Sequence, residues 1–94
     1  MITVHINNDG IIMQGHAGHH ANGQDLVCAA VSALTCSLIH SLKHLSGNRI
    51  RAETDDGKAV IRWDSLTEKG KLLVDSWFLG IAAIDQDYHC ITFV

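Results

Sequence analysis

The period at which hydrophobic residues recur changes along this chain, and that change limits the possible folds more than any other feature. Ile2, Val4 and Ile6 alternate with polar residues, which is typical of a strand with one buried face. Residues 7–10, Asn-Asn-Asp-Gly, tolerate a positive φ and predict a tight turn into a second strand over residues 11–14. The chain is therefore expected to open as a β-hairpin.

A period of three to four residues replaces this alternation after residue 25. Apolar residues recur at that spacing from Leu26 to Leu45, which predicts a helix of about 20 residues with a wide apolar face. Asp25 is its expected N-cap and Gly47 its expected C-terminal stop. Residues 15–24 hold three glycines and three histidines without an apolar period. They predict a loop, and its length suggests a functional role.

The second half of the chain repeats the same order of elements. Residues 50–54 and 59–63 alternate around a short Asp-Asp-Gly turn, which predicts a second hairpin. Ser-Leu-Thr-Glu at residues 65–68 matches the capping box, with Ser65 as the N-cap of a helix that extends to about Asp85. A short apolar run then predicts a closing strand.

These elements give the order ββαββαβ within a single domain of residues 1–94. The strands have polar outward positions, and each helix has one apolar face. The expected fold class is α+β, a two-layer sandwich in which both helices cover one face of a mostly antiparallel sheet.

Charge and cysteine content argue against several classes of partner. A net charge of −3 with scattered Lys and Arg lacks the clustered positive field that direct DNA binding needs. The longest uncharged stretch, residues 26–42, is interrupted by serines and a histidine, so no membrane span is expected. Three cysteines without disulfide spacing, and no secretory signal at the start, predict a reducing, cytoplasmic compartment.

Residue types suited to nucleophilic catalysis surround the predicted loop. His16 follows the second strand, and Asp25 and Cys28 lie at the start of the helix. With Asp25 as the N-cap, Cys28 is the third helical residue, where free N–H groups and the helix dipole stabilise a thiolate. The same N–H groups are able to face the oxyanion of an acyl-transfer reaction.

Other interpretations of these residues stay open. A cysteine in the first turn of an apolar helix is more often a small core residue, and a histidine after a strand is usually solvated. His16, His19, His20 and Cys28 are also competent Zn²⁺ ligands, but the paired short spacing of structural zinc sites is missing. We therefore expect neither a metal nor another cofactor. Packing roles are expected for the remaining thiols and for the tryptophans: Cys36, Cys90, Trp63 and Trp77.

Two motifs resemble a known family, the ribosomal-processing cysteine proteases. Its glycine-histidine-alanine motif matches residues 15–17, and its longer motif around a cysteine matches Asp-Leu-Val-Cys-Ala-Ala-Val-Ser-Ala-Leu at residues 25–34. The resemblance implies that His16 and Cys28 are a catalytic dyad and that Asp25 assists them. It also implies a homodimer that trims an N-terminal extension from a large-subunit ribosomal protein; phage-encoded relatives extend the possible substrates to a phage structural protein.

Two functions follow as hypotheses. The first is a cytoplasmic cysteine endopeptidase that uses His16 and Cys28 on a peptide segment of a ribosomal protein. The alternative is a non-catalytic dimeric module that adds a peptide of a ribosomal or phage protein to a sheet edge. A homodimer is expected in either case, because a sheet covered on one side leaves more apolar surface than one small core hides.

Overall fold

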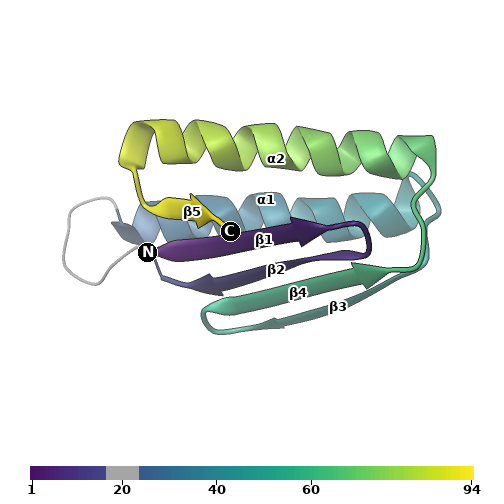
Figure 1. Cartoon of the computed structure of the whole chain (residues 1–94), viewed down its shortest axis with the longest axis horizontal. Coiled ribbons are helices and arrows are strands. Elements are labelled where there is room, and N and C mark those ends of the chain that lie inside the picture. The colour runs from purple at the N-terminus through teal and green to yellow at the C-terminus, as the bar shows by residue number, and fades with distance from the viewer. Residues whose placement is uncertain (17–23) are drawn as a thin grey trace.

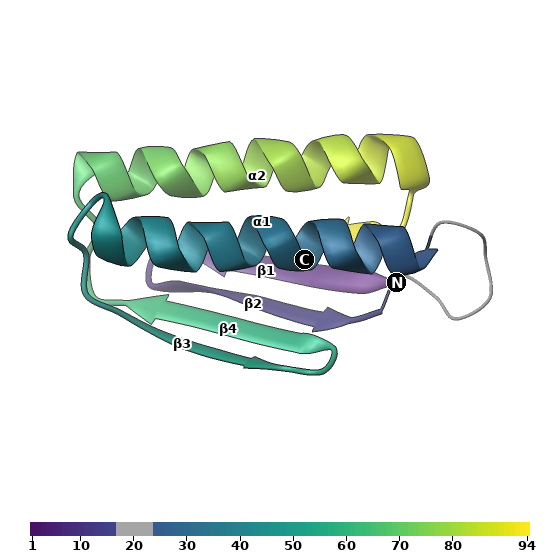
Figure 2. The ribbon, with the colours of Figure 1, turned by 180° about the vertical axis from the view of Figure 1, so that it is seen from behind.

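The structure, a computed structural model, describes residues 1–16 and 24–94, except for the side chains of residues 24 and 25. The first half of the chain forms the strands β1 (Ile2–Asn7) and β2 (Gly10–Gly15) and the helix α1 (Gln24–His44). Figures 1 and 2 show α1 lying along one face of the sheet that these strands enter. The predicted hairpin and helix are both confirmed.

The second half repeats this order and adds a final strand. It forms β3 (Ile50–Asp55), β4 (Lys58–Trp63), α2 (Glu68–Tyr88) and the short strand β5 (Ile91–Phe93). Helix α2 lies beside α1 on the same face of the sheet, and no helix formed by residues 1–16 or 24–94 covers the other face (Figure 1). The predicted ββαββαβ order and the two-layer α+β architecture are confirmed.

The sheet joins the two halves through strands that are distant in sequence. Its order is β3-β4-β2-β1-β5, so the second hairpin pairs with the first through β4 and β2. These two strands are antiparallel and place Gln14 opposite Lys58. The β1–β5 pair is parallel, and the other three pairs are antiparallel. As a consequence, the end of β2 meets the turn between β3 and β4.

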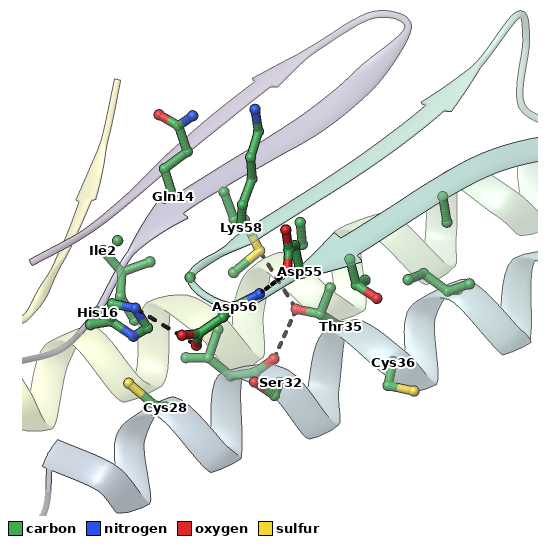
Figure 3. A pocket seen from close by; sticks show the side chains of 18 of the residues that line it. Ile2, Gln14, His16, Cys28, Ser32, Thr35, Cys36, Asp55, Asp56 and Lys58 are labelled. Atoms are coloured by element: carbon green, nitrogen blue, oxygen red, sulfur yellow. Dashed lines mark hydrogen bonds and ion pairs between the residues drawn. The ribbon is translucent and has the colours of Figure 1, made fainter.

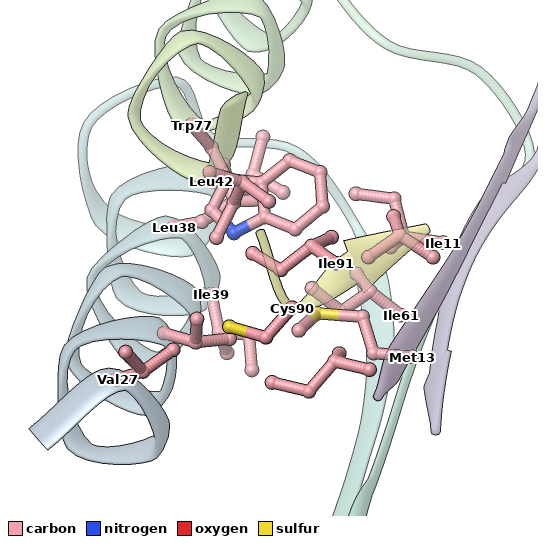
Figure 4. Close-up of a cluster of buried hydrophobic side chains, with 14 of the residues drawn as sticks. Ile11, Met13, Val27, Leu38, Ile39, Leu42, Ile61, Trp77, Cys90 and Ile91 are labelled. Carbon is pink, nitrogen blue, oxygen red and sulfur yellow. The ribbon is translucent and has the colours of Figure 1, made fainter. Parts of the chain in front are cut away.

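The core lies between the sheet and the two helices (Figure 4). Its most deeply buried side chains include Ile11 and Ile61 from the sheet and Leu42 and Ile81 from the helices. The buried Trp77 indole N–H donates to Thr35 Oγ1 at 3.2 Å, which satisfies a polar group inside the core. The predicted burial of both tryptophans and of Cys90 is confirmed.

The packing role predicted for Cys36 is wrong. Its side chain is exposed on α1, because the helix turns that residue away from the stripe that contacts the sheet. Helical periodicity permits this, since the apolar face of α1 is formed by residues three and four apart, such as Val27 and Val31, or Ile39 and Leu42.

Both helices begin at residues other than those predicted. Helix α1 begins at Gln24, so Asp25 lies inside its first turn and is not the N-cap. Helix α2 begins at Glu68 with Thr67, not Ser65, as the N-cap. The Thr67 hydroxyl accepts from the Gly70 N–H at 3.1 Å, and it also contacts Asn48. That tertiary contact favours the later cap, which the local capping-box pattern could not indicate.

One segment of α1, Leu26–His44, is long and apolar enough to cross a membrane. A buried core helix passes the same test of length and composition. Here the apolar stripe of α1 packs on the sheet and on α2, and 33% of the segment is buried inside the fold.

Candidate active site

A cavity of about 610 Å³ opens between α1 and the strands β2, β3 and β4. One wall is formed by α1 and includes residues spaced four apart, which places them along one helix face: Cys28, Ser32, Cys36 and His40. The opposite wall includes Ala52 and Ala59 from the second hairpin, and His16 lies at the end nearest Cys28 (Figure 3). The structure therefore brings His16 and Cys28, which are distant in sequence, to one cavity.

The backbone around His16 is held by neighbours on two sides. The N–H of Gly15 donates to the carbonyl of Gly57 at 2.8 Å, and the Met1 amino group donates to the His16 carbonyl at 2.6 Å. Gly15 has a φ of 103°, a conformation that favours glycine, and a Cβ there would collide with the Met1 carbonyl. These contacts turn the chain so that the His16 side chain enters the cavity.

Cys28 lies one turn inside α1, not at the third helical position that the sequence predicts. Since α1 begins at Gln24, Cys28 is separated from the helix start by residues 24–27. Its N–H is then bonded to a carbonyl four residues earlier and does not serve as an oxyanion donor. The thiol remains half-buried against the core and faces the cavity, with its Cα–Cβ bond tilted towards the positive helix N-terminus (Figure 3).

Asp56, in the turn between β3 and β4, is a site residue that sequence reasoning missed. Its Oδ1 lies 3.8 Å from Nε2 of His16, within the range of an ion pair. Locally, the Asp-Asp-Gly run indicates only a turn. The signal that would reveal its role is the pairing of β2 with β4, which is tertiary.

The three thiols have different surroundings. Cys28 is half-buried beside the cavity, and Cys36 is exposed farther along the same wall. Burial raises the pKa of the Cys90 thiol above its ordinary value, and the nearby Asp85 carboxylate raises it further. Cys90 is therefore held as a neutral thiol in the core and is a poor nucleophile at neutral pH.

Some predicted site residues fall outside the described part of the chain. The side chain of Asp25 is one of them, although its backbone belongs to the first turn of α1. His19 and His20, ligands of the alternative metal site, are also outside it. Within residues 1–16 and 24–94, no group of three or more His, Cys, Asp or Glu side chains is placed to hold a metal ion.

Comparison with known proteins settles the family. The model of the family described as "Cysteine protease Prp" matches residues 1–91. The chain belongs to this family. As a Prp family member it is a cysteine protease, which confirms the predicted class of enzyme.

Named relatives agree with this assignment. The ribosomal processing cysteine protease Prp of Staphylococcus aureus strain Mu50 is 32% identical over 98 residues, covering 95% of this chain and 92% of the relative. The protein of the same name from Bacillus subtilis is 25% identical over 83 residues, with 81% and 74% covered.

Solved structures of the Prp family share the fold. The S. aureus Prp bound to a covalently linked product peptide superposes with a TM-score of 0.84 at 29% identity, covering 99% of this chain and 97% of that one. A second S. aureus structure, with a substrate peptide, has a TM-score of 0.78 at 23% identity, covering 99% and 95%, and supports the fold alone.

Proposed function

We propose that this Prp family member is an endopeptidase whose nucleophile is Cys28 and whose base is His16. One observation carries the proposal: the end of β2 and the first turns of α1 present these two side chains to the same cavity. A half-buried thiol beside an imidazole is the arrangement that activates cysteine nucleophiles. The other thiols of the described chain are either buried in the core or farther along the cavity wall.

The bond-making and bond-breaking steps involve these two side chains and water. His16 takes the proton from Cys28 Sγ, and the thiolate attacks the peptide carbonyl carbon. The tetrahedral intermediate collapses to a thioester when the His16 imidazolium protonates the leaving amine. Water then attacks the thioester while His16 accepts its proton, and the intermediate releases the carboxylic acid and the free thiol. The Asp25 carboxylate is proposed to assist from the first turn of α1.

The proposed substrate is an N-terminal extension of a large-subunit ribosomal protein. Named relatives are ribosomal processing proteases, and one of them holds a covalently linked product peptide. The cavity of this chain extends along α1 from Cys28 to His40, which suits an extended peptide better than a compact ligand. Alanines and Ile39 on its walls leave room for apolar side chains. A homodimer in the cytoplasm stays part of the proposal.

The test is cleavage of the N-terminally extended ribosomal protein from the same genome, followed by mass spectrometry of both products. The wild-type chain is expected to cut it once, and Cys28→Ser is expected to be inactive. Cys36→Ser is the matched thiol control, because it removes a thiol two helical turns along the same wall. It should slow cleavage by no more than a few-fold.

Thiol reactivity separates the protease from a non-catalytic peptide-binding module. In a Cys36→Ser background, iodoacetamide should modify Cys28 faster at pH 6.5 than it modifies a simple thiol, and His16→Ala should abolish that excess. A Cys28 that reacts no faster than a simple thiol, in a protein that binds the substrate without cutting it, would support the binding module instead.

A further inference from the structure

The turn between β3 and β4 reaches across the sheet to the residue proposed as the catalytic base. Because β2 pairs with β4 up to Gln14 and Lys58, the next residues on each strand, Gly15 and Gly57, face each other, and His16 follows directly. The Gly15 N–H closes this contact by donating to the Gly57 carbonyl at 2.8 Å. The second hairpin thus supplies part of the surroundings of His16, although it contributes no residue to the dyad.

Gly57 is placed directly against the imidazole ring. A Cβ built on Gly57 would lie 2.6 Å from Nε2 of His16 and 3.1 Å from the adjacent ring carbon. Contacts below 3.0 Å force a displacement, so an alanine here must move either the ring or the turn. Gly57 also has a φ of 71°, which favours glycine independently of the ring.

Asp56 faces the same ring nitrogen. Its Oδ1 lies 3.8 Å from Nε2, which is within ion-pair range and longer than a direct hydrogen bond. Catalytic hydrogen bonds are often long before substrate binds and tighten in the complex. A carboxylate on the Nε2 side favours a proton on that nitrogen and leaves Nδ1 to accept the proton of a thiol. The same charge stabilises the imidazolium that forms during the reaction.

We propose that the β3–β4 turn positions the catalytic imidazole, with Gly57 providing the space for the ring and Asp56 orienting it through Nε2 so that Nδ1 serves Cys28. This rests on the proposed His16–Cys28 dyad and adds residues that the two sequence motifs do not contain. Asp56 and Gly57 are positioning residues, since they act through His16 and do not contact the reacting atoms.

The two contributions differ in size. The Asp56 side chain is 95% exposed, so solvent screens its charge, and an exposed ion pair changes an equilibrium by only about twofold to fivefold. A displaced ring has a larger effect, because a misplacement of about 1 Å in a catalytic group can cost about 100-fold in rate. Gly57 is therefore the more demanding test.

The decisive comparison is Gly57→Ala against Gly47→Ala. Gly47 has nearly the same φ, 65°, but an added Cβ there meets no atom within 4 Å. Both variants should lose similar thermal stability from backbone strain. Gly57→Ala should lower kcat/KM about 100-fold, mostly through kcat, whereas Gly47→Ala should stay within about twofold of the wild type.

Asp56 is tested by how its variants divide their effect between kcat and KM. Asp56→Ala and Asp56→Asn should both lower kcat about threefold with little change in KM, because each removes the charge that stabilises the imidazolium formed during the reaction. Asp64→Ala, which removes an exposed carboxylate just beyond the end of β4, should leave both kcat and KM unchanged.

The alkylation rate of Cys28 by iodoacetamide keeps this inference separate from the proposed protease function. A wild-type chain that fails to cut the ribosomal protein refutes the proposed substrate, yet the slower alkylation expected in Gly57→Ala relative to Gly47→Ala would still support the positioning role. If the two glycine variants alkylate and cleave alike, or if the Asp56 variants lower kcat no more than Asp64→Ala does, the positioning role is refuted.

Discussion

The two ββα halves of the chain have the same order of elements, but the first half holds the proposed dyad and the second half supports it. In each half a hairpin leads into a helix that covers the same face of the sheet. The fifth residue of α1 is Cys28, which is half-buried beside the cavity, whereas the fifth residue of α2 is Leu72, which is 69% exposed. The same position therefore carries a thiol beside a cavity in one helix and an exposed apolar side chain in the other.

The connection between hairpin and helix accounts for much of this difference. In the second half only residues 64–67 separate β4 from α2, and Thr67 caps the helix locally. In the first half residues 16–23 separate β2 from α1, so that His16 leaves the sheet well before the helix begins. The second half places its β3–β4 turn beside the candidate active site of the first half. In a fold built from two similar halves, one half can thus carry the active site while the other half contacts and positions its residues.

The largest effect should come from the residue that most distinguishes the halves. Cys28→Ala is expected to reduce cleavage at least about 10⁴-fold, because the nucleophile has no substitute. Leu72→Ala, at the equivalent position of α2, should leave kcat/KM within about twofold. Circular dichroism would show that both variants keep the fold. Substantial cleavage by Cys28→Ala would disprove the proposed dyad.

Asp25 lies in the first turn of α1 and Glu68 in the first turn of α2. Removing each charge compares the effect of the two helix starts on cleavage. Asp25→Asn should retain more activity than Cys28→Ala, with a loss of about tenfold, because it keeps the side-chain shape and removes only a charge from the first turn of α1. Glu68→Gln makes the same change in α2 and should not alter cleavage. If Asp25→Asn is as inactive as Cys28→Ala, the Asp25 charge is essential to the reaction.

Exposed leucines on α2 provide a test of assembly. Leu72 and Leu79 lie seven residues apart on one helix face, and each is 69% exposed. We expect a symmetric homodimer of about twice 10.2 kDa by light scattering, and Leu79→Lys should shift the equilibrium towards the monomer. Lys71→Leu, a change on a neighbouring exposed position, should not weaken the dimer. A wild-type monomer at micromolar concentration would contradict the expectation.

Thr67 is the N-cap of α2, and substituting it tests how much this cap stabilises the fold. Thr67→Ala removes the side-chain cap and should lower the free energy of unfolding by about 1 kcal/mol without changing the catalytic rate. Thr67→Ser keeps the hydroxyl and should recover most of that loss. Urea unfolding of both variants measures the difference, and equal stabilities would show that the cap contributes little.

The smallest effect is expected from the thiol in the core. The raised pKa of Cys90 means that the unfolded chain ionises this thiol at lower pH than the folded chain does. The resulting stability is complete below about pH 9 and declines as pH rises above it. Cys90→Ala should therefore show a shallower alkaline decline than the wild type, while Cys36→Ala should not. Parallel declines in all three proteins would contradict the pKa shift.

Local patterns predicted most of the elements but not their ends. Alternation in the strands and the apolar stripes of the helices gave the order and the class correctly, because both patterns reflect burial of one face. The N-caps were wrong at Asp25 and Ser65, since several residues near a helix start are able to cap and tertiary contacts choose among them. The packing role predicted for Cys36 was wrong, because the sequence does not show which face of α1 contacts the sheet.

The sequence by itself determined the two ββα units, the closing strand and the candidate pair His16 and Cys28, since periodicity and motif spacing are local properties. Only the tertiary structure decided that β4 lies beside β2 and that Asp56 and Gly57 meet the His16 ring. The physical reason is that pairing between non-consecutive strands depends on how whole hairpins pack on the helices. No short stretch of sequence contains that information.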